Sequence, residues 1–196
     1  MRLRDPNDAT ADDRGGVYFS DPGLFSRQTR PHGAVMYLSA AGALTRVAGP
    51  LWYPNGVFAD VEQRKLYVDE HMSGRVLRYD VMPDGRLEGP SVFVDINQVE
   101  RRRRYRDAYA ETGPDGLEIG PDGHVYVAIY GEGRVLRFSP AGRLAGILEL
   151  PSRYTTSIGF NQAGEAAVTS VYEHEDPPYR GEVRLYSPSA LTRASR

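Results

Sequence analysis

The sequence predicts an all-β protein of the β-propeller class, with about four blades in the chain. Short runs rich in Val, Ile, Tyr, Phe and Leu recur throughout, broken by Gly, Pro, Asp or Asn, which is typical of many short strands and no long helix. The runs also repeat, since residues 65–79 and 124–138 share one pattern of apolar positions. A repeat of about four strands indicates a propeller blade, whereas a β-sandwich, the alternative class, predicts no such repetition.

The expected blades begin near residues 7, 55, 115 and 156 and form a single, incomplete domain over residues 1–196. Each start is followed by a tight turn, a run rich in Tyr or Val, and a run that mixes aliphatic and aromatic residues. In chain order the expected strands cover residues 17–21, 34–40, 44–48, 56–59, 65–70, 76–81, 91–96, 116–119, 124–130, 135–139, 144–150, 157–160, 165–171 and 182–187.

Two closely spaced copies of Pro-Asp-Gly have different predicted roles. Pro121-Asp122-Gly123 separates two apolar runs and has the chemistry of a hairpin turn, with Gly123 available for a positive φ. Pro114-Asp115-Gly116 instead opens an apolar run. Asp115 is therefore a carboxylate at the start of a buried strand, which a turn does not explain.

One face of the expected propeller collects the candidate functional residues. The innermost strand of each blade starts on this face, which places Asn7, Asn55, Asp115 and Thr156 around the central axis. Three long connections, at residues 22–33, 97–113 and 173–181, lie on the same face, and long loops on a rigid scaffold commonly carry binding sites.

Asn55 and Asp115 are oxygen donors at equivalent positions of adjacent blades, and oxygen donors suit Ca²⁺ or a similar divalent cation. The alternative is that each side chain caps its own strand or bonds a turn. Asn7 stands in the same register and favours the metal interpretation.

A series of motifs resembles successive blades of the senescence marker protein / gluconolactonase / luciferin-regenerating enzyme family, from residue 7 to about residue 186. These motifs are Pro6-Asn7-Asp8, Gly16-Val17-Tyr18-Phe19-Ser20-Asp21-Pro22-Gly23, Pro54-Asn55-Gly56-Val57, Leu66-Tyr67-Val68, Pro114-Asp115-Gly116-Leu117 and Thr156-Ser157-Ile158-Gly159-Phe160. Their order and spacing, more than any single motif, make the resemblance specific.

The resemblance implies a six-bladed propeller that binds one divalent metal, most often Ca²⁺, with Zn²⁺, Mn²⁺ or Mg²⁺ as alternatives, and that hydrolyses a lactone or ester. It implies that Asn55 and Asp115 bind the metal, that Asn7 contacts substrate, and that Asp115 is also the catalytic general base. A metal in such a site polarises the lactone carbonyl and activates water, and a carboxylate accepts the proton.

The chain also departs from the family pattern. Family members begin with about two more blades, and the first of these carries a metal-binding Glu; Asp5 stands where many members have Arg. A site with one carboxylate ligand binds Ca²⁺ less tightly, because affinity depends on ligand charge and number. The alternative function is therefore a non-catalytic binding module or an inactive truncated homologue. Exposed blade faces also predict self-association, a ring closed with fewer blades, or a fragment of a longer protein.

Composition limits the partners. With 24 basic and 26 acidic residues and a pI near 6.1, the chain has no charge signature for nucleic acid or a membrane surface. Zero cysteines exclude disulfides, and the lack of a long apolar run predicts a cytoplasmic protein. The four arginines at residues 101–104 predict a solvated loop or helix face, or else a cap that attracts an anionic substrate.

Overall fold

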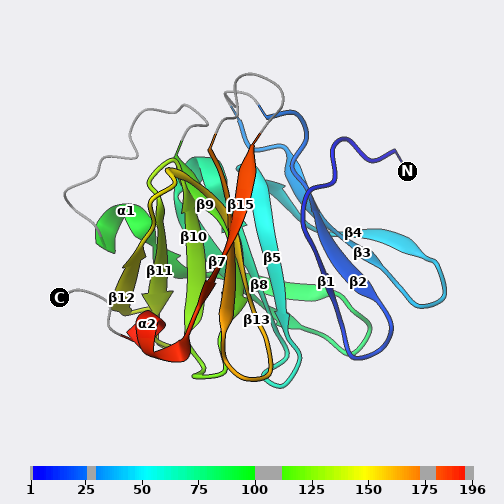
Figure 1. Cartoon of the computed structure of the whole chain (residues 1–196). Coiled ribbons are helices and arrows are strands. Elements are labelled where there is room, and N and C mark those ends of the chain that lie inside the picture. The colour runs from blue at the N-terminus through cyan, green and yellow to red at the C-terminus, as the bar shows by residue number, and fades with distance from the viewer. Residues whose placement is uncertain (1, 26–29, 100–111, 173–179, 193–196) are drawn as a thin grey trace. The chain divides into compact units, whose positions relative to one another are not determined.

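The computed structural model describes residues 2–25, 30–99, 112–172 and 180–192, which form antiparallel sheets of sequential strands (Figure 1). The chain divides into two compact units, residues 1–110 and residues 111–196. The first unit contains two four-stranded sheets. Their strands are β1 (Ala9–Ala11), β2 (Val17–Asp21), β3 (Gly33–Leu38) and β4 (Leu44–Leu51), then β5 (Pro54–Asp60), β6 (Lys65–Glu70), β7 (Arg75–Val81) and β8 (Leu87–Asp95).

The second unit contains one four-stranded sheet and one that has three strands within the described residues. Their strands are β9 (Gly113–Ile119), β10 (Val125–Tyr130), β11 (Arg134–Phe138) and β12 (Leu144–Glu149), then β13 (Tyr154–Phe160), β14 (Ala166–Val171) and β15 (Gly181–Tyr186). The helices are short: a 3-10 turn η1 (His71–Ser73), α1 (Ile96–Val99) and α2 (Pro188–Thr192). In the described part of the chain, no helix has the length and apolar character needed to cross a bilayer.

Each sheet is a meander in which every strand pairs with its neighbours along the chain, as expected of a blade. The all-β class is confirmed, and so are most expected strands. The main difference is in the first blade, where β1 is a three-residue strand that the apolar pattern of the sequence did not show.

The core of the first unit forms where strands of its two sheets bury both faces. Strand β6 has five fully buried residues in a row, from Leu66 to Glu70, instead of the alternation of a half-exposed strand. The cluster around it contains Tyr18, Val35, Tyr37, Leu51, Val57, Leu66, Val68, Leu77 and Tyr79. The second unit has its own core, which includes Tyr126, Ile158, Val168 and Leu191, so that α2 is anchored by Leu191.

The predicted hairpin turn at Pro121-Asp122-Gly123 joins β9 to β10, and Gly123 has a φ of 72°. The Asp122 carboxylate accepts hydrogen bonds from the hydroxyl of Tyr126 at 2.9 Å and the guanidinium of Arg137 at 2.7 Å. This second copy of the tripeptide is therefore structural, as its position in the sequence predicted.

Candidate metal and substrate site

Asn55 lies in a β-bulge near the start of β5. The pairing of β5 with β6 shifts between Pro54 and Val57, so Asn55 and Gly56 together face the single residue Asp69. A bulge turns a side chain out of the regular alternation of a strand, and such irregularities are common beside functional sites. Asn55 is 5% exposed, and the N–H of Gly56 donates to Asp69 Oδ2 at 3.1 Å. The bulge and the bond to Asp69 therefore fix the backbone that carries the buried Asn55 side chain.

Asn7 has an equivalent place in the first sheet. Its N–H donates to the carbonyl of Ser20 at 3.1 Å, while the N–H of Ser20 donates to the carbonyl of Asp8 at 2.9 Å. Two consecutive residues thus share one partner, as in β5. The N–H of Asp8 also donates to Ser20 Oγ at 3.1 Å, which matches the bond from Gly56 to Asp69. Asn7 itself is exposed.

The first unit brings these two asparagines to the same end of neighbouring inner strands. The N–H of Val57 donates to the Asp8 carboxylate at 2.9 Å, and the N–H of Ala59 donates to Thr10 Oγ1 at 3.2 Å. Both bonds join residues 49 positions apart, so β1 and β5 lie side by side and run in the same direction. Asn7 is therefore level with the Asn55–Gly56 bulge.

Asp8 itself serves the fold. Burial raises the pKa of this carboxyl above its ordinary value, against the opposing effect of hydrogen bonds from the N–H groups of Val57 and Ala9. The bond to Val57 satisfies a donor on the open edge of β5, where an unpaired buried N–H would cost stability. Asp8 is therefore an edge cap between two sheets, next to the candidate site.

Asp69 is a residue that the sequence reasoning missed. It is fully buried on β6, directly opposite the Asn55–Gly56 bulge. A buried carboxylate needs hydrogen bonds or charge partners, and one of its bonds comes from Gly56. The available signal was the acidic pair Asp69-Glu70 at the end of an apolar run, since both side chains are buried there.

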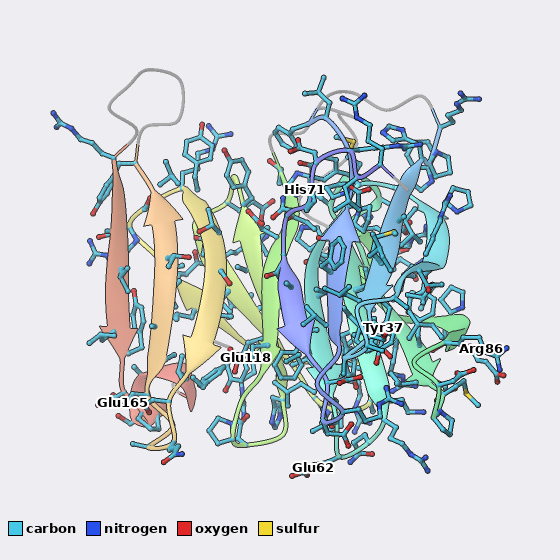
Figure 2. The ribbon with its side chains drawn as sticks, turned by 90° about the vertical axis from the view of Figure 1, so that its right-hand side faces the viewer. Tyr37, Glu62, His71, Arg86, Glu118 and Glu165 are labelled. Carbon is cyan, nitrogen blue, oxygen red and sulfur yellow. The ribbon has the colours of Figure 1, made fainter. Side chains whose placement is uncertain are left out.

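An aromatic cluster borders this end of the first unit. The Tyr53 ring lies 5.0 Å from the ring of Phe25 and 5.9 Å from that of His71, and Phe25 and His71 are 5.5 Å apart. Tyr53 has a φ of 51°, which is uncommon for a bulky residue and is found most often at turns and functional sites. Figure 2 shows His71 at one end of the first unit and Glu62, in the β5–β6 turn, at the opposite end.

Glu70 holds the segment that carries this cluster. Its buried carboxylate accepts hydrogen bonds from the N–H of Trp52 at 2.8 Å, Ser73 Oγ at 2.9 Å and the Arg75 guanidinium at 2.6 Å. With all three partners in place, the charge of Glu70 is satisfied and the backbone before Tyr53 is fixed. Glu70 is therefore a structural residue, although it lies close to the candidate site.

Asp115 lies in a bulge of the second unit with the same pattern as that of Asn55. The pairing of β9 and β10 places Asp115 and Gly116 opposite the single residue Ala128, and Asp115 is half-buried. A Cβ at Gly116 would lie 2.4 Å from Ser157 Oγ and 2.8 Å from Ser157 Cα, which explains why glycine follows Asp115. Close packing of β13 therefore fixes the backbone that carries the carboxylate.

Thr156, the fourth aligned position, is the extra residue of a bulge in β13. Its hydroxyl lies 2.7 Å from the hydroxyl of Thr169 on the neighbouring strand. The bulge thus recurs, but this side chain is engaged within its own sheet.

The candidate residues suit a hard divalent cation by their chemistry. Asn7 and Asn55 have amide oxygens and Asp115 has a carboxylate, which are the donor types that Ca²⁺ prefers. Asn55 and Asp115 each lie in a β-bulge, where the regular side-chain alternation of the strand is interrupted. Over the ranges that the structure describes, His, Asp and Glu side chains form no group of three suited to a metal ion. The four arginines at 101–104, and parts of the long connections expected at residues 22–33, 97–113 and 173–181, lie outside the described residues.

The repeated meanders define a β-propeller, and comparison with known proteins identifies its family. The model of the SMP-30/Gluconolactonase/LRE-like region matches residues 1–172. The chain belongs to this family, which confirms the resemblance inferred from the blade motifs.

The curated relatives include staphylococcal lactonases. Lactonase drp35 of Staphylococcus saprophyticus is 33% identical over 148 residues, and that of Staphylococcus haemolyticus has the same identity over the same length. These alignments cover 75% of this chain and 42% of each relative, so the chain spans less than half of the relatives' length.

Solved structures confirm the propeller fold. A luciferin-regenerating enzyme matches with a TM-score of 0.74 at 21% identity, over 93% of this chain and 61% of that protein. The regucalcin of Agrobacterium tumefaciens, a calcium-binding protein, matches with a TM-score of 0.72 at 23% identity, over 88% and 55% of the two chains. A gluconolactonase from Xanthomonas campestris matches with a TM-score of 0.69 at 24% identity, over 94% and 58%.

Proposed function

We propose that this chain provides the catalytic carboxylate of a metal-dependent hydrolase that opens a sugar or aliphatic lactone. In this proposal Asn55 and Asp115 bind the metal, Ca²⁺ in the first place, Asn7 contacts substrate, and Asp115 is the general base. The relatives named lactonase and gluconolactonase support the reaction class.

The observation that carries the proposal is the recurrence of one local geometry. Asn7, Asn55 and Asp115 stand at the start of successive inner strands, each at a point where two residues face one. A bulge repeated in this way is more than a turn requirement, because the turns of these sheets are elsewhere. Beside Asn7, the hydrogen bond from the N–H of Val57 on β5 goes to the neighbouring Asp8 carboxylate.

The bound metal would supply polarisation of the lactone carbonyl and a lower pKa for water. The Asp115 carboxylate accepts a proton from water as the water oxygen forms a bond to the carbonyl carbon. The ring C–O bond then breaks, and the departing ring oxygen takes the proton back from Asp115. The Asn7 side chain, which is exposed, donates a hydrogen bond to a substrate oxygen and orients the ring.

The test compares two Pro-Asp-Gly tripeptides. Asp115→Asn keeps the shape of the side chain but removes the base, so lactone hydrolysis is expected to fall by at least about 100-fold. Asp84→Asn is the matched control, because Asp84 is exposed in the hairpin turn Pro83-Asp84-Gly85 and its carboxylate accepts hydrogen bonds from the backbone N–H and the guanidinium of the neighbouring Arg86. Hydrolysis is followed by acid release with glucono-1,5-lactone and γ-valerolactone, with and without Ca²⁺.

Metal binding is measured separately from turnover. Thermal melting at rising Ca²⁺ concentration is expected to show stabilisation of wild type, because a ligand that binds only the folded state raises its stability. Asn55→Ala is expected to lose this shift. Wild-type activity in Asp115→Asn, or hydrolysis that a chelator leaves unchanged, would contradict the proposal.

The second candidate function is a ligand-binding propeller without turnover. It is favoured by the charge of the candidate metal ligands, since Asn55 is a neutral amide, Asp115 is the one carboxylate of the pair, and Ca²⁺ affinity grows with the number of carboxylates. This alternative predicts that the wild type folds without metal and hydrolyses no lactone with Ca²⁺, Zn²⁺, Mn²⁺ or Mg²⁺.

A further inference from the structure

The outer edge of β15 differs from the corresponding edge in the other sheets. In each four-stranded sheet the third strand pairs with a fourth, as β3 does with β4, β7 with β8 and β11 with β12. Among the described residues, β15 pairs only with β14. Val183 and Leu185 on this strand are 65% and 79% exposed. An extended apolar edge is a template for pairing with another strand.

The hydrogen-bonding phase of β15 shows which groups face outward. The N–H of Tyr172 donates to the carbonyl of Arg180 at 2.8 Å, just beyond the paired stretch of β14 and β15. Because bonded and non-bonded pairs alternate in an antiparallel ladder, residues 182 and 184 direct their backbone groups to β14. The backbone N–H and C=O groups of Gly181, Val183 and Leu185 therefore point away from the sheet.

We propose that two copies of this chain pair through β15, antiparallel, with Val183 opposite Val183 of the second copy. Outward-facing residues must pair with outward-facing residues, which restricts the register to shifts of two. If the antiparallel pairing were centred on residue 182, Glu182 would face Glu182 of the second copy. If it were centred on residue 184, Arg184 would face Arg184, so both registers place like charges opposite each other. Centring on Val183 places Glu182 opposite Arg184 of the second copy, twice, by symmetry.

The side chains on the apolar face agree with this register. Leu185 lies opposite Gly181 of the second copy, which has no side chain to compete for space. Val183 and Leu185 of both copies then form one cluster of four aliphatic side chains, and each loses much of its present exposure. The charged face of β15 also fits this register. Glu182 and Arg184 form an ion pair at 2.7 Å within one copy, and in the dimer the two pairs would form a row of four charges of alternating sign.

The pairing is expected to be weak and concentration-dependent. One strand from each copy buries less surface than a standard protein interface, so the dissociation constant is expected to be roughly 10 μM or higher. Sedimentation velocity of the wild type from about 1 μM to about 500 μM should therefore show a monomer that converts to a dimer. A single monomeric species over this range would overturn the proposal.

Charge reversal tests the register. Glu182→Arg places Arg opposite Arg184, and Arg184→Glu places Glu opposite Glu182; each is expected to weaken dimerisation at least about 10-fold. The double variant Glu182→Arg with Arg184→Glu restores opposite charges and is expected to restore the dimer. Asp84→Arg, a reversal in a hairpin turn of the first unit, is the control and should leave dimerisation unchanged. A double variant as weak as the single variants would overturn the register.

Hydrogen exchange separates this pairing from other occupants of the edge. The amide of Val183 should exchange fast in dilute solution and slowly where the dimer forms, while the amide of Arg184, bonded to β14, is protected throughout. Protection of Val183 in dilute monomer would show that another segment covers the edge, and would overturn the proposal. Melting of all variants in dilute solution controls for folding, since the single variants also lose the Glu182–Arg184 ion pair.

Discussion

The carboxylate of Asp8 on β1 accepts a hydrogen bond from the backbone N–H of Val57 on β5 at 2.9 Å. It thereby satisfies a donor on the free edge of the next inner strand. The second unit has a parallel, since the Glu118 carboxylate accepts a hydrogen bond from the N–H of Phe160 on β13. In both cases an acidic side chain joins two neighbouring sheets by a hydrogen bond. Asp8 is next to the candidate residue Asn7, and Glu118 is close in sequence to the candidate residue Asp115.

Replacing Asp8 should separate the value of this hydrogen bond from the cost of the buried charge. Asp8→Ala leaves the N–H of buried Val57 without an acceptor and is expected to cost about 1–3 kcal/mol in the free energy of unfolding. Asp8→Asn retains an oxygen for Val57 and should be less destabilising. Urea unfolding at pH 7 measures both. Equal losses in the two variants would contradict the edge-cap role.

The pH dependence of the Asp8 variants has a definite sign. Burial raises the pKa of Asp8 in the folded state, so the folded state binds the proton more tightly than the unfolded state. The stability of the wild type relative to Asp8→Asn should therefore decline as the pH rises above the ordinary pKa of 3.8, and level off once Asp8 is ionised in both states. An advantage that grows with pH in this range would contradict the burial effect.

Asp12 should behave in the opposite way. Burial alone would raise its pKa, but hydrogen bonds from the Tyr37 hydroxyl at 2.7 Å and the N–H groups of Arg14 and Gly16 hold it at about 2. Its stabilisation is present above the unfolded pKa and is lost between about pH 4 and about pH 2. Asp12→Asn is expected to cost about 1–2 kcal/mol above pH 4 and much less at pH 2.

Tyr37→Phe provides the companion measurement for Asp12. It removes one hydrogen bond and leaves the ring in the core, so a loss of about 1 kcal/mol is expected at pH 7. The pKa of Asp12 should also rise toward its ordinary value, which a titration followed by NMR can detect. An unchanged pKa in Tyr37→Phe would show that the backbone donors and the Arg14 guanidinium hold Asp12 ionised without the Tyr37 hydroxyl.

Features that depend on residues close together in the sequence were predicted, and features that depend on a neighbouring strand were not. The strand pairs β6–β7 and β10–β11 were predicted because their apolar pattern is local and repeated. The turn at Gly123 was predicted because it needs only a glycine between two runs. The bulges at Asn55 and Asp115 could not be predicted, since they depend on how many residues the neighbouring strand supplies opposite them.

The burial of particular polar residues also could not be predicted from the sequence. Asp69 is a charged residue of a type that usually lies on the surface, but here it is buried and accepts a hydrogen bond from the N–H of Gly56. No local pattern in the sequence indicates this burial. Asp8 was read as part of a motif beside Asn7, and its bond to Val57 joins residues 49 positions apart. Such contacts depend on the packing of one sheet against the next.

Arg64 in the β5–β6 turn provides a test of backbone strain. It is exposed and has a φ of 51°, and its carbonyl accepts a hydrogen bond from Val81 at 2.9 Å. Because the left-handed region is costly for a residue with a Cβ, Arg64→Gly is expected to stabilise the protein by about 0.5–1 kcal/mol. Thermal and urea unfolding measure the gain.

Glu62 is the matched control for Arg64. It is exposed in the same turn and is not among the residues with a positive φ (Figure 2). Glu62→Gly removes no strain and adds freedom to the unfolded chain, so a loss of about 0.5–1 kcal/mol is expected. Changes of the same sign at both positions would contradict the strain argument.

Gly116 and Gly123 end the two neighbouring copies of Pro-Asp-Gly and should respond differently to substitution. At Gly116 a Cβ would meet Ser157 at 2.4–2.8 Å, including its backbone, so Gly116→Ala is expected to cost at least about 2–3 kcal/mol. At Gly123 nothing lies within 4 Å of a Cβ, and the only obstacle is a φ of 72°. Gly123→Ala is therefore expected to cost about 1–2 kcal/mol.

Asparagine separates the two causes, because it tolerates the left-handed region but is larger than alanine. Gly123→Asn should recover much of the stability that Gly123→Ala loses, whereas Gly116→Asn should be at least as destabilising as Gly116→Ala. The free energies of unfolding of the four variants in urea decide the matter. Recovery by asparagine at Gly116 would show that β13 can move away from β9, and that the backbone carrying Asp115 is less firmly fixed than the close packing against Ser157 implies.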